Sequence, residues 1–116
     1  MEAHERALLL TALLEAPERC GDITNRLQAS AWDSDEELVE LSRSHLIKAL
    51  ERVVVGALLQ AEVENWANAL EGRDDVGLES GHEGVIREAV HWMANPVLEG
   101  KITPASARTW LGRLQK

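Results

Sequence analysis

Residues 56–70 read GALLQAEVENWANAL, and residues 100–114 read GKITPASARTWLGRL. In each stretch an aliphatic residue follows the glycine by two positions, a tryptophan follows it by ten, and a leucine follows the tryptophan by four. Glycine suits the left-handed turn that ends a helix, and residues four apart share one face of the helix that follows. The repeat therefore predicts one helix-turn-helix corner that is used twice.

Further helices are predicted on both sides of this repeat. Apolar residues at three- and four-residue spacing predict a first helix over residues 3–15, which Pro17 ends. Asp22 is expected to cap a short second helix. A long helix is predicted to begin in the Ser-x-x-Glu capping box of residues 34–37 and to end at Gly56.

The C-terminal half of the chain predicts three more helices. The first is the helix of the first corner, which ends at Gly72. The second follows another capping box at residues 80–83 and breaks at Asn95-Pro96. In the last, Thr103 supplies the cap and Pro104 the first helical position.

The fold class follows from what the sequence lacks as well as from these helices. No segment alternates polar and apolar residues as a strand does, and the chain has no Tyr and no Phe, residues in which sheets are rich. We predict an all-α bundle of about five or six helices, built from antiparallel helical hairpins. The 116 residues fit a single helical domain, residues 1–116.

Two features of the sequence bear on the cellular location of the protein. No apolar run is long enough to span a bilayer. The single cysteine, Cys20, excludes an internal disulfide and fits a reducing compartment. We therefore expect a cytoplasmic protein.

The charge of the chain is strongly acidic and unevenly spread. Twenty acids against twelve bases give a net charge of −8. This balance argues against nucleic acid and against a membrane surface as direct ligands, because both are bound through lysine and arginine. Five acids lie in residues 33–40 and seven in residues 62–83, whereas residues 101–116 carry four bases and no acid. The acidic part is expected to meet a basic partner.

No set of residues predicts a catalytic or metal centre. Glu88 and His91 have the Glu-x-x-His spacing of a di-iron half-site, but such a site needs a second motif of this kind and two further glutamates. His82 and Glu83 would form an acid–base pair without a nucleophile or an oxyanion donor. The acidic, glycine-rich loop of residues 72–84 does not fit the EF-hand pattern. We therefore expect a protein that is not an enzyme and that uses no cofactor and no metal.

The four tryptophans divide into two pairs. Trp66 and Trp110 occupy matched positions of the repeat on apolar helix faces, which predicts that both pack in the core. Trp32 lies in a connection beside an acidic run, and Trp92 lies at the edge of an apolar stripe. Tryptophan is enriched at binding hot spots, so these two are candidate anchors for a partner as well as candidate core residues.

Residues 55–67, VGALLQAEVENWA, resemble a pattern of small bacterial helical proteins encoded near polymorphic or contact-dependent toxins. In these proteins a Gly-x-aliphatic-Ser/Thr corner leads into a helix carrying Trp-Ala, and here Leu59 stands at the Ser/Thr position. The similarity covers roughly residues 46–114. It implies an immunity protein, an acidic cytoplasmic domain that binds and blocks a toxin domain, often a basic nuclease.

The leading hypothesis is a non-catalytic protein-binding domain of this immunity type, which masks the cleft of a cognate toxin with acids that mimic phosphates. The expected partner-binding residues are the acids of the loop and of the long helix together with two tryptophans: Asp74, Asp75, Glu79, Glu36, Glu37, Glu40, Trp92 and Trp32.

Two alternatives come from other classes of protein. One is a self-associating helical structural or regulatory subunit, a homodimer in which the basic C-terminus of one copy meets the acidic loop of another. Arg108, Arg113 and Lys116 would supply the basic charge. The other alternative is a small metal-dependent enzyme.

Overall fold

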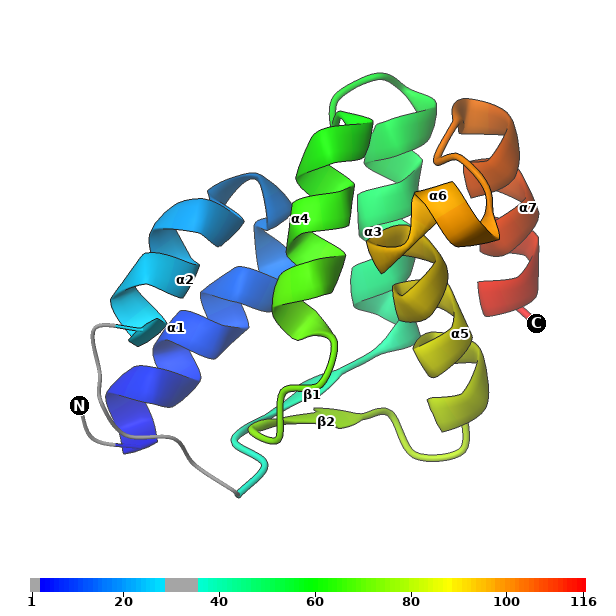
Figure 1. Cartoon of the computed structure of the whole chain (residues 1–116). Coiled ribbons are helices and arrows are strands. Elements are labelled where there is room, and N and C mark those ends of the chain that lie inside the picture. Colours follow the sequence, from blue (N-terminus) through cyan, green and yellow to red (C-terminus); the bar gives the residue numbers. More distant parts are fainter. Residues whose placement is uncertain (1–2, 29–35) are drawn as a thin grey trace.

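The computed structural model describes residues 3–28 and 36–116, whose arrangement Figure 1 shows. The elements are α1 (Ala3–Glu15), η1 (Pro17–Arg19), α2 (Cys20–Gln28), β1 (Val39–Leu41), α3 (Arg43–Val54), α4 (Gln60–Leu70), β2 (Val76–Leu78), α5 (Glu83–Ala94), α6 (Pro96–Glu99) and α7 (Pro104–Leu114). Within these residues there are seven α-helices, the short 3-10 helix η1 and two strands of three residues each. The described chain is therefore mostly helical, as predicted, and it carries a small sheet that was not predicted.

The helices pack in neighbouring pairs around one apolar core. α3 packs mainly against α7, and α4 packs mainly against α5. α1 and α2 contact each other, and α2 also packs against α4, so these two helices cover one side of the bundle (Figure 1). β1 leads into α3 and β2 follows α4, which places the sheet at the end of the α3–α4 hairpin (Figure 1).

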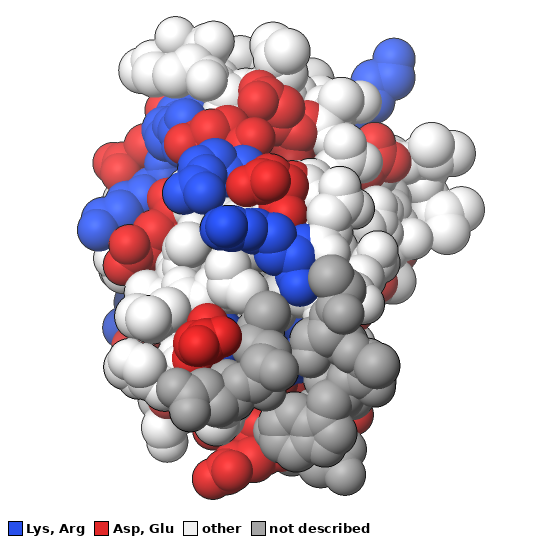
Figure 2. Space-filling model, turned by 90° about the vertical axis from the view of Figure 1, so that its left-hand side faces the viewer, with Lys and Arg blue, Asp and Glu red and all other residues white. Residues whose placement is uncertain are grey.

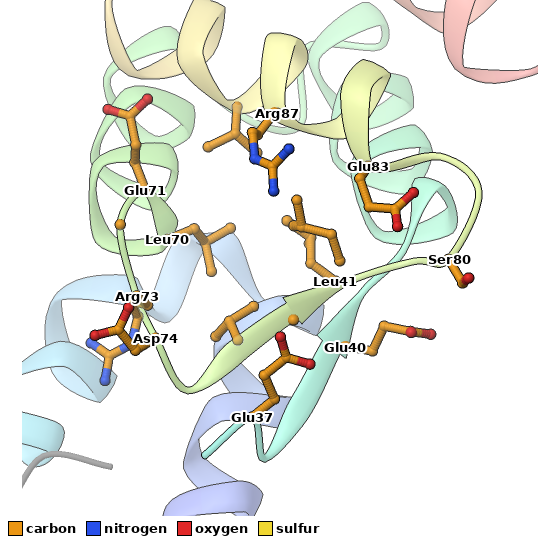
Figure 3. A pocket seen from close by; sticks show the side chains of 15 residues that line it. Glu37, Glu40, Leu41, Leu70, Glu71, Arg73, Asp74, Ser80, Glu83 and Arg87 are labelled. Atoms are coloured by element: carbon orange, nitrogen blue, oxygen red, sulfur yellow. The ribbon is translucent and has the colours of Figure 1, made fainter. Parts of the chain in front are cut away.

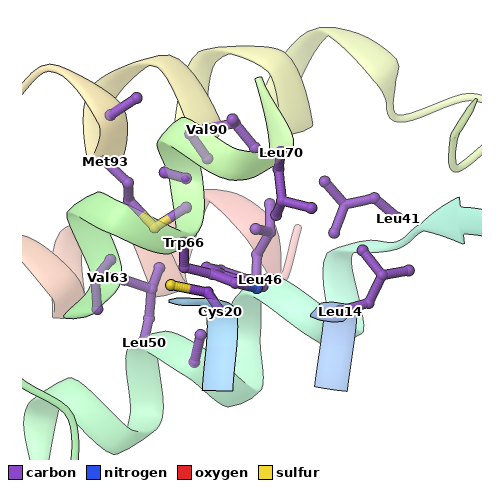
Figure 4. Close-up of a cluster of buried hydrophobic side chains, with 14 of the residues drawn as sticks. Leu14, Cys20, Leu41, Leu46, Leu50, Val63, Trp66, Leu70, Val90 and Met93 are labelled. Carbon is purple, nitrogen blue, oxygen red and sulfur yellow. The ribbon is translucent and has the colours of Figure 1, made fainter. Parts of the chain in front are cut away.

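Trp66 lies at the centre of the core (Figure 4). Its side chain is fully buried, and its indole Nε1–H donates a hydrogen bond of 2.7 Å to the backbone oxygen of Leu13. Buried side chains from five helices and from β1 surround it, among them Leu14, Cys20, Leu41, Leu46, Leu50, Val63, Leu70, Val90 and Met93. Trp66 thus ties α4 to α1 by both packing and a buried hydrogen bond.

The two predicted corners are present. Gly56 and Gly100 have positive φ angles of 78° and 111°, and the aliphatic residues two positions later, Leu58 and Ile102, are buried. The helices that follow the two corners are capped in different ways. At the second corner Thr103 Oγ1 accepts the backbone N–H of residue 106 at 3.1 Å, as predicted for a cap. At the first corner a glutamate of the next helix accepts the N–H of the cap position instead, at 2.9 Å.

Alanine substitutions at two glycines are expected to change stability in opposite directions. Gly100→Ala should lower the free energy of unfolding by about 1–2 kcal/mol, because a side chain strains the backbone at its φ of 111°. Gly112→Ala should raise it by about 0.5–1 kcal/mol, because Gly112 lies inside α7 with open space around an added Cβ. Urea unfolding of both variants tests this, and equal effects would contradict a corner that depends on its glycine.

The prediction of a long helix that begins at residues 34–37 is wrong. Residues 39–41 form β1, and α3 begins only at Arg43. Ser42 is the N-cap, and its backbone N–H donates to His45 Nδ1 at 3.0 Å. The apolar spacing around Leu41 fits a helix and a strand equally well. The segment forms a strand because it pairs with β2. Ser34 and Asp35 of the predicted capping box lie outside the described residues.

Two further helix starts differ from the prediction. α2 begins at Cys20, directly after η1, so Asp22 lies inside the first turn and is not the cap. α5 begins at Glu83, and its N-cap position, His82, makes no side-chain capping bond, so the capping box predicted to start at Ser80 is wrong. Gly81, with φ of 85°, turns the chain between Ser80 and His82.

The structure adds two facts about the environment of the chain. Among the described residues, no helix combines the length and the apolar character that crossing a bilayer requires. Cys20 is a free, buried cysteine, and burial raises the pKa of its thiol, which disfavours the reactive thiolate. Cys20 therefore acts as a small core residue.

Candidate functional site

A groove of about 620 Å³ lies between the sheet, the end of α4 and the first half of α5 (Figure 3). Figure 3 shows Glu83 and Arg87 of α5 across the groove from Glu37 and Glu40, which lie on the side of β1. Its apolar lining comes from Leu41, Leu70, Val76, Leu78 and Val90, and its other lining residues are Glu37, Glu40, Glu71, Gly72, Arg73, Asp74, Gly77, Ser80, Glu83 and Arg87. The lining is therefore mixed: its apolar residues are mostly buried, and charged side chains make up most of the remaining lining residues.

The sheet brings distant segments together at this groove. β1 and β2 pair in parallel, with Val39 opposite Val76, Glu40 opposite Gly77 and Leu41 opposite Leu78. The α3–α4 hairpin makes the crossover between the two strands, as a parallel pair requires. Acids that lie far apart in the sequence thus share one surface.

Gly77 allows the acid beside it to lie close to the sheet. A Cβ built on Gly77 would overlap the carboxylate of Glu37. Glycine at this position of β2 therefore leaves room for Glu37 over the strand, at the border of the groove. No side chain of β2 itself covers the outer face of the sheet at this point.

Asp75 anchors the start of β2 from inside the molecule. Its side chain is 3 % exposed and accepts a hydrogen bond from Arg6 Nε at 2.9 Å and a bidentate pair from Arg73 at 2.8 and 2.9 Å. Its backbone oxygen accepts the N–H groups of Leu38 and Val39, at 2.9 and 3.4 Å. One residue thus joins α1, β1 and β2.

The electrostatics of this anchor favour the ionised carboxylate. Burial opposes ionisation, but the hydrogen bonds and charges of Arg73 and Arg6 outweigh it, and the pKa of Asp75 lies below its ordinary value. Arg6 is itself only 2 % exposed. A buried arginine needs such a partner, because an unpaired buried charge is costly.

A second brace holds the other end of β2. Glu79 Oε1 accepts hydrogen bonds from the backbone N–H and from Nε of Arg43, at 3.0 and 3.1 Å. These bonds, to the backbone and to the side chain of Arg43, lower the pKa of Glu79. The backbone N–H of Glu79 donates to Leu41 at 2.9 Å. Glu79 therefore fixes β2 to the start of α3.

The rim of the groove carries more acid than base. Five carboxylates, those of Glu37, Glu40, Glu71, Asp74 and Glu83, face two guanidinium groups, those of Arg73 and Arg87. Nε and Nη2 of Arg73 already donate to Asp75, so these two groups are not available to a ligand. A ligand in the groove meets a negative field.

Another face of the molecule gives a contrast. On the α1–α2 side, Figure 2 shows basic side chains interleaved with acids. Arg19 lies 3.6 Å from Asp22, and Arg52 lies 2.8 Å from Glu18. Charges of opposite sign cancel there over short distances, whereas the acids of the groove outnumber its bases.

The structure divides the expected partner-binding acids into two groups. Glu37, Glu40 and Asp74 line the groove and are exposed. Asp75 is buried in its arginine pairs and serves as an internal brace, whereas Glu79 is bound to Arg43 and stays partly exposed. The expectation that Asp75 contacts a partner is corrected accordingly, and the expectation for Glu79 stays a prediction. Glu36 is exposed and does not line the groove.

The expectation for the tryptophans is also corrected. Trp92 is 3 % exposed, and its Nε1–H donates to the backbone oxygen of Gly100 at 2.9 Å, so it offers no anchor to a partner. Trp110, predicted to be buried like Trp66, is only partly buried and stacks on Trp92 at 5.2 Å with an interplanar angle of 13°. Trp32 lies outside the described residues.

A serine and a histidine also meet at the start of α3, 3.0 Å apart from Ser42 Oγ to His45 Nδ1. The same nitrogen accepts the backbone N–H of Ser42, which assigns the pair to helix capping. Burial lowers the pKa of His45 and so favours the neutral ring that can accept this bond. Among the described residues, no group of three or more His, Cys, Asp or Glu side chains is placed to hold a metal ion.

Sequence reasoning missed part of the groove. Glu71 and Glu83 belong to the acidic stretch noted in the sequence, but nothing in their local pattern separates them from other solvated acids. Arg87 is exposed and lies on α5, and only the approach of α5 to the sheet makes it a lining residue. Comparison of the chain with protein-family models, curated proteins and solved structures finds no match.

Proposed function

We propose that the protein is a non-catalytic binding protein that takes a basic protein partner into the acidic groove. The more specific form of the proposal is an immunity protein, which neutralises a cognate toxin domain, such as a basic nuclease, by masking its active cleft. The observation that carries it is the charge of the groove, where five carboxylates face two guanidinium groups.

The physical argument rests on complementarity. A groove lined largely by charged side chains attracts a partner of opposite charge, and such charges supply association rate and specificity. Acidic carboxylates match the lysine and arginine side chains with which a nuclease holds phosphate. Glu40 and Asp74 are exposed and, within the described residues, make no ion pair that a partner would have to break.

The alternative of a self-associating subunit has less support. Arg113, one of the three basic residues it would use, is bound to Glu88 of the same chain and lies 4.1 Å from the ring of Trp110. A second copy would have to displace these contacts. The alternative keeps a clear signature, a dimer that dissociates as salt rises.

A charge-reversal experiment tests the proposed function. The wild-type protein, the double variant Glu40→Lys/Asp74→Lys and the control Glu15→Lys/Glu51→Lys are each used to capture a partner from the native cytoplasm at low and high salt. Both variants change the net charge equally, and all four residues are exposed. We expect the groove variant to lose at least about tenfold in affinity for the captured partner and the control to lose less than about threefold.

The captured partner must also fit the proposal. We expect a basic protein whose purified toxin activity falls when the wild-type protein is added and returns when the groove variant replaces it. Equal loss with the groove variant and the control would contradict a groove-mediated interaction. Recovery of the protein alone as a salt-sensitive dimer would favour the self-association alternative.

A further inference from the structure

We propose that the free edge of β2 is the docking element of the groove, and that an extended basic segment of a partner protein adds to the sheet there as a third strand. This inference rests on the proposed function and deepens it, because it names the backbone groups and the kind of segment involved. The segment is expected to alternate basic and apolar side chains.

The hydrogen bonds at both ends of β2 show which way its backbone points. Asp75 O accepts the N–H of Val39, and Glu79 N–H donates to Leu41 O. In a parallel pair, alternate residues of a strand direct their N–H and C=O groups at the partner. Gly77, midway between Asp75 and Glu79, therefore faces β1 as well.

The residues between them face the other way. The N–H and C=O groups of Val76 and Leu78 point away from β1, and within the described residues neither makes a hydrogen bond on that side. Both residues line the groove. The groove therefore contains two free donors and two free acceptors at strand spacing, which an extended segment can satisfy.

β2 is a short strand, but it lacks the residues that normally protect an edge. Many natural edge strands carry lysine, proline or a bulge that prevents pairing with another chain. β2 reads Val-Gly-Leu, has no charged side chain, and pairs with β1 in unbroken register. Its edge is thus competent for pairing.

The two faces of the sheet define the segment that fits. Residues in register project to the same face, so Leu41 and Leu78 share the inner face, where Leu41 is 1 % exposed. Glu40 and Gly77 share the outer face, where Glu37 also lies. An added strand would alternate between these faces, with apolar side chains on the inner face and lysine or arginine beside the glutamates.

The charge of the rim selects a basic segment from a different protein over a second copy of this chain. A second copy pairing through the same edge would bring its own rim acids against these ones, and like charges in such proximity repel. A lysine-bearing segment meets complementary charge instead. The commitment is therefore to a basic, extended partner segment.

Amide hydrogen exchange with a defined peptide tests this directly. The probe is a capped synthetic peptide of about six residues with alternating lysine and valine. In the free protein the amides of Val76 and Leu78 should exchange fast, whereas the amides of Gly77 and Leu41 should be protected by the ladder. Peptide binding should slow exchange at Val76 and Leu78 by at least about tenfold and leave the other two unchanged.

A pair of variants separates the backbone contribution from the side chain. Leu78→Ala and Leu78→Pro both remove the leucine side chain, but only proline removes the outward N–H. Proline is tolerated at an edge position whose N–H is not in the ladder, and circular dichroism checks that both variants fold. We expect Leu78→Ala to bind the peptide within about threefold of wild type and Leu78→Pro to bind at least about tenfold more weakly.

Several results would overturn the proposal. They are absence of peptide binding at low salt, binding without protection of Val76 and Leu78, equal binding by the two variants, and protection of these amides in the protein alone. A peptide that keeps the lysines and valines but groups them in two blocks should bind more weakly, and equal binding would show attraction by charge alone. In that last case the proposed function stands and the strand-addition inference fails.

Discussion

Replacing Asp75 with alanine is expected to lower the free energy of unfolding by about 3–5 kcal/mol. The substitution leaves Arg6, which is 2 % exposed, without the carboxylate that it contacts at 2.9 Å. It also frees Arg73, which holds the same carboxylate through two hydrogen bonds. Urea unfolding at neutral pH, followed by far-UV circular dichroism, measures the loss.

The neighbouring acid provides the matched control. Asp74 is exposed and lines the groove, so Asp74→Ala should change the free energy of unfolding by less than about 0.5 kcal/mol. The two variants remove the same charge at adjacent positions. A similar effect of both would mean that the arginine pairs of Asp75 contribute little to the fold.

The same anchor predicts a dependence on pH. Folding lowers the pKa of Asp75, so its contribution is complete above the pKa of the unfolded chain, which is about 4, and is lost as pH falls through the folded value. Asp75→Asn cannot ionise and lacks this contribution at every pH. The gap in unfolding free energy between wild type and Asp75→Asn should therefore narrow below about pH 4. A gap that stays constant down to acidic pH would contradict the assignment.

These residues show why the sequence predicts some parts of the fold and not others. Pro17, Gly56, Gly100 and Thr103 act through their own backbone geometry or through a neighbour three residues away, so their roles are visible locally. Asp75 pairs with Arg6, which lies 69 residues earlier. Nothing near Asp75 in the sequence distinguishes it from the solvated Asp74.

The strands were missed for a related reason. β1 and β2 have three residues each, too few to show an alternation of polar and apolar side chains. Their pairing joins residues 39–41 to residues 76–78 across a helical hairpin, and only that contact makes either segment a strand. The groove was not predicted, but three of its lining acids, Glu37, Glu40 and Asp74, were named from the sequence as partner contacts, because acid-rich stretches are visible in composition. Its free strand edge is a consequence of tertiary pairing and was not predicted.

The tryptophans mark the limit of the sequence repeat. Trp66 and Trp110 have the same spacing from their glycines, but the helix that carries Trp66 lies in the middle of the bundle and the helix that carries Trp110 lies at its side (Figure 1). The repeat therefore specifies the turn and the helix start, whereas burial depends on what packs against each helix.

Replacing Trp66 with alanine is expected to lower the free energy of unfolding by about 3–5 kcal/mol. The variant removes a fully buried side chain from the centre of the core and leaves the backbone oxygen of Leu13 without the donor that it has at 2.7 Å. Trp66→Phe keeps most of the apolar burial and loses the N–H, so its cost should fall at about 1–3 kcal/mol. Far-UV circular dichroism is the suitable measurement, because these variants alter the tryptophan fluorescence itself.

Trp110 supplies the internal comparison for this experiment. It is partly buried and stacks on Trp92, and the guanidinium of Arg113 lies over its ring, 4.1 Å from the ring centroid. Trp110→Ala should therefore cost about 1–2 kcal/mol, less than the same change at Trp66. Equal losses of unfolding free energy would mean that the two corners are equivalent in packing as well as in backbone. They would contradict the distinction between a central and a lateral tryptophan.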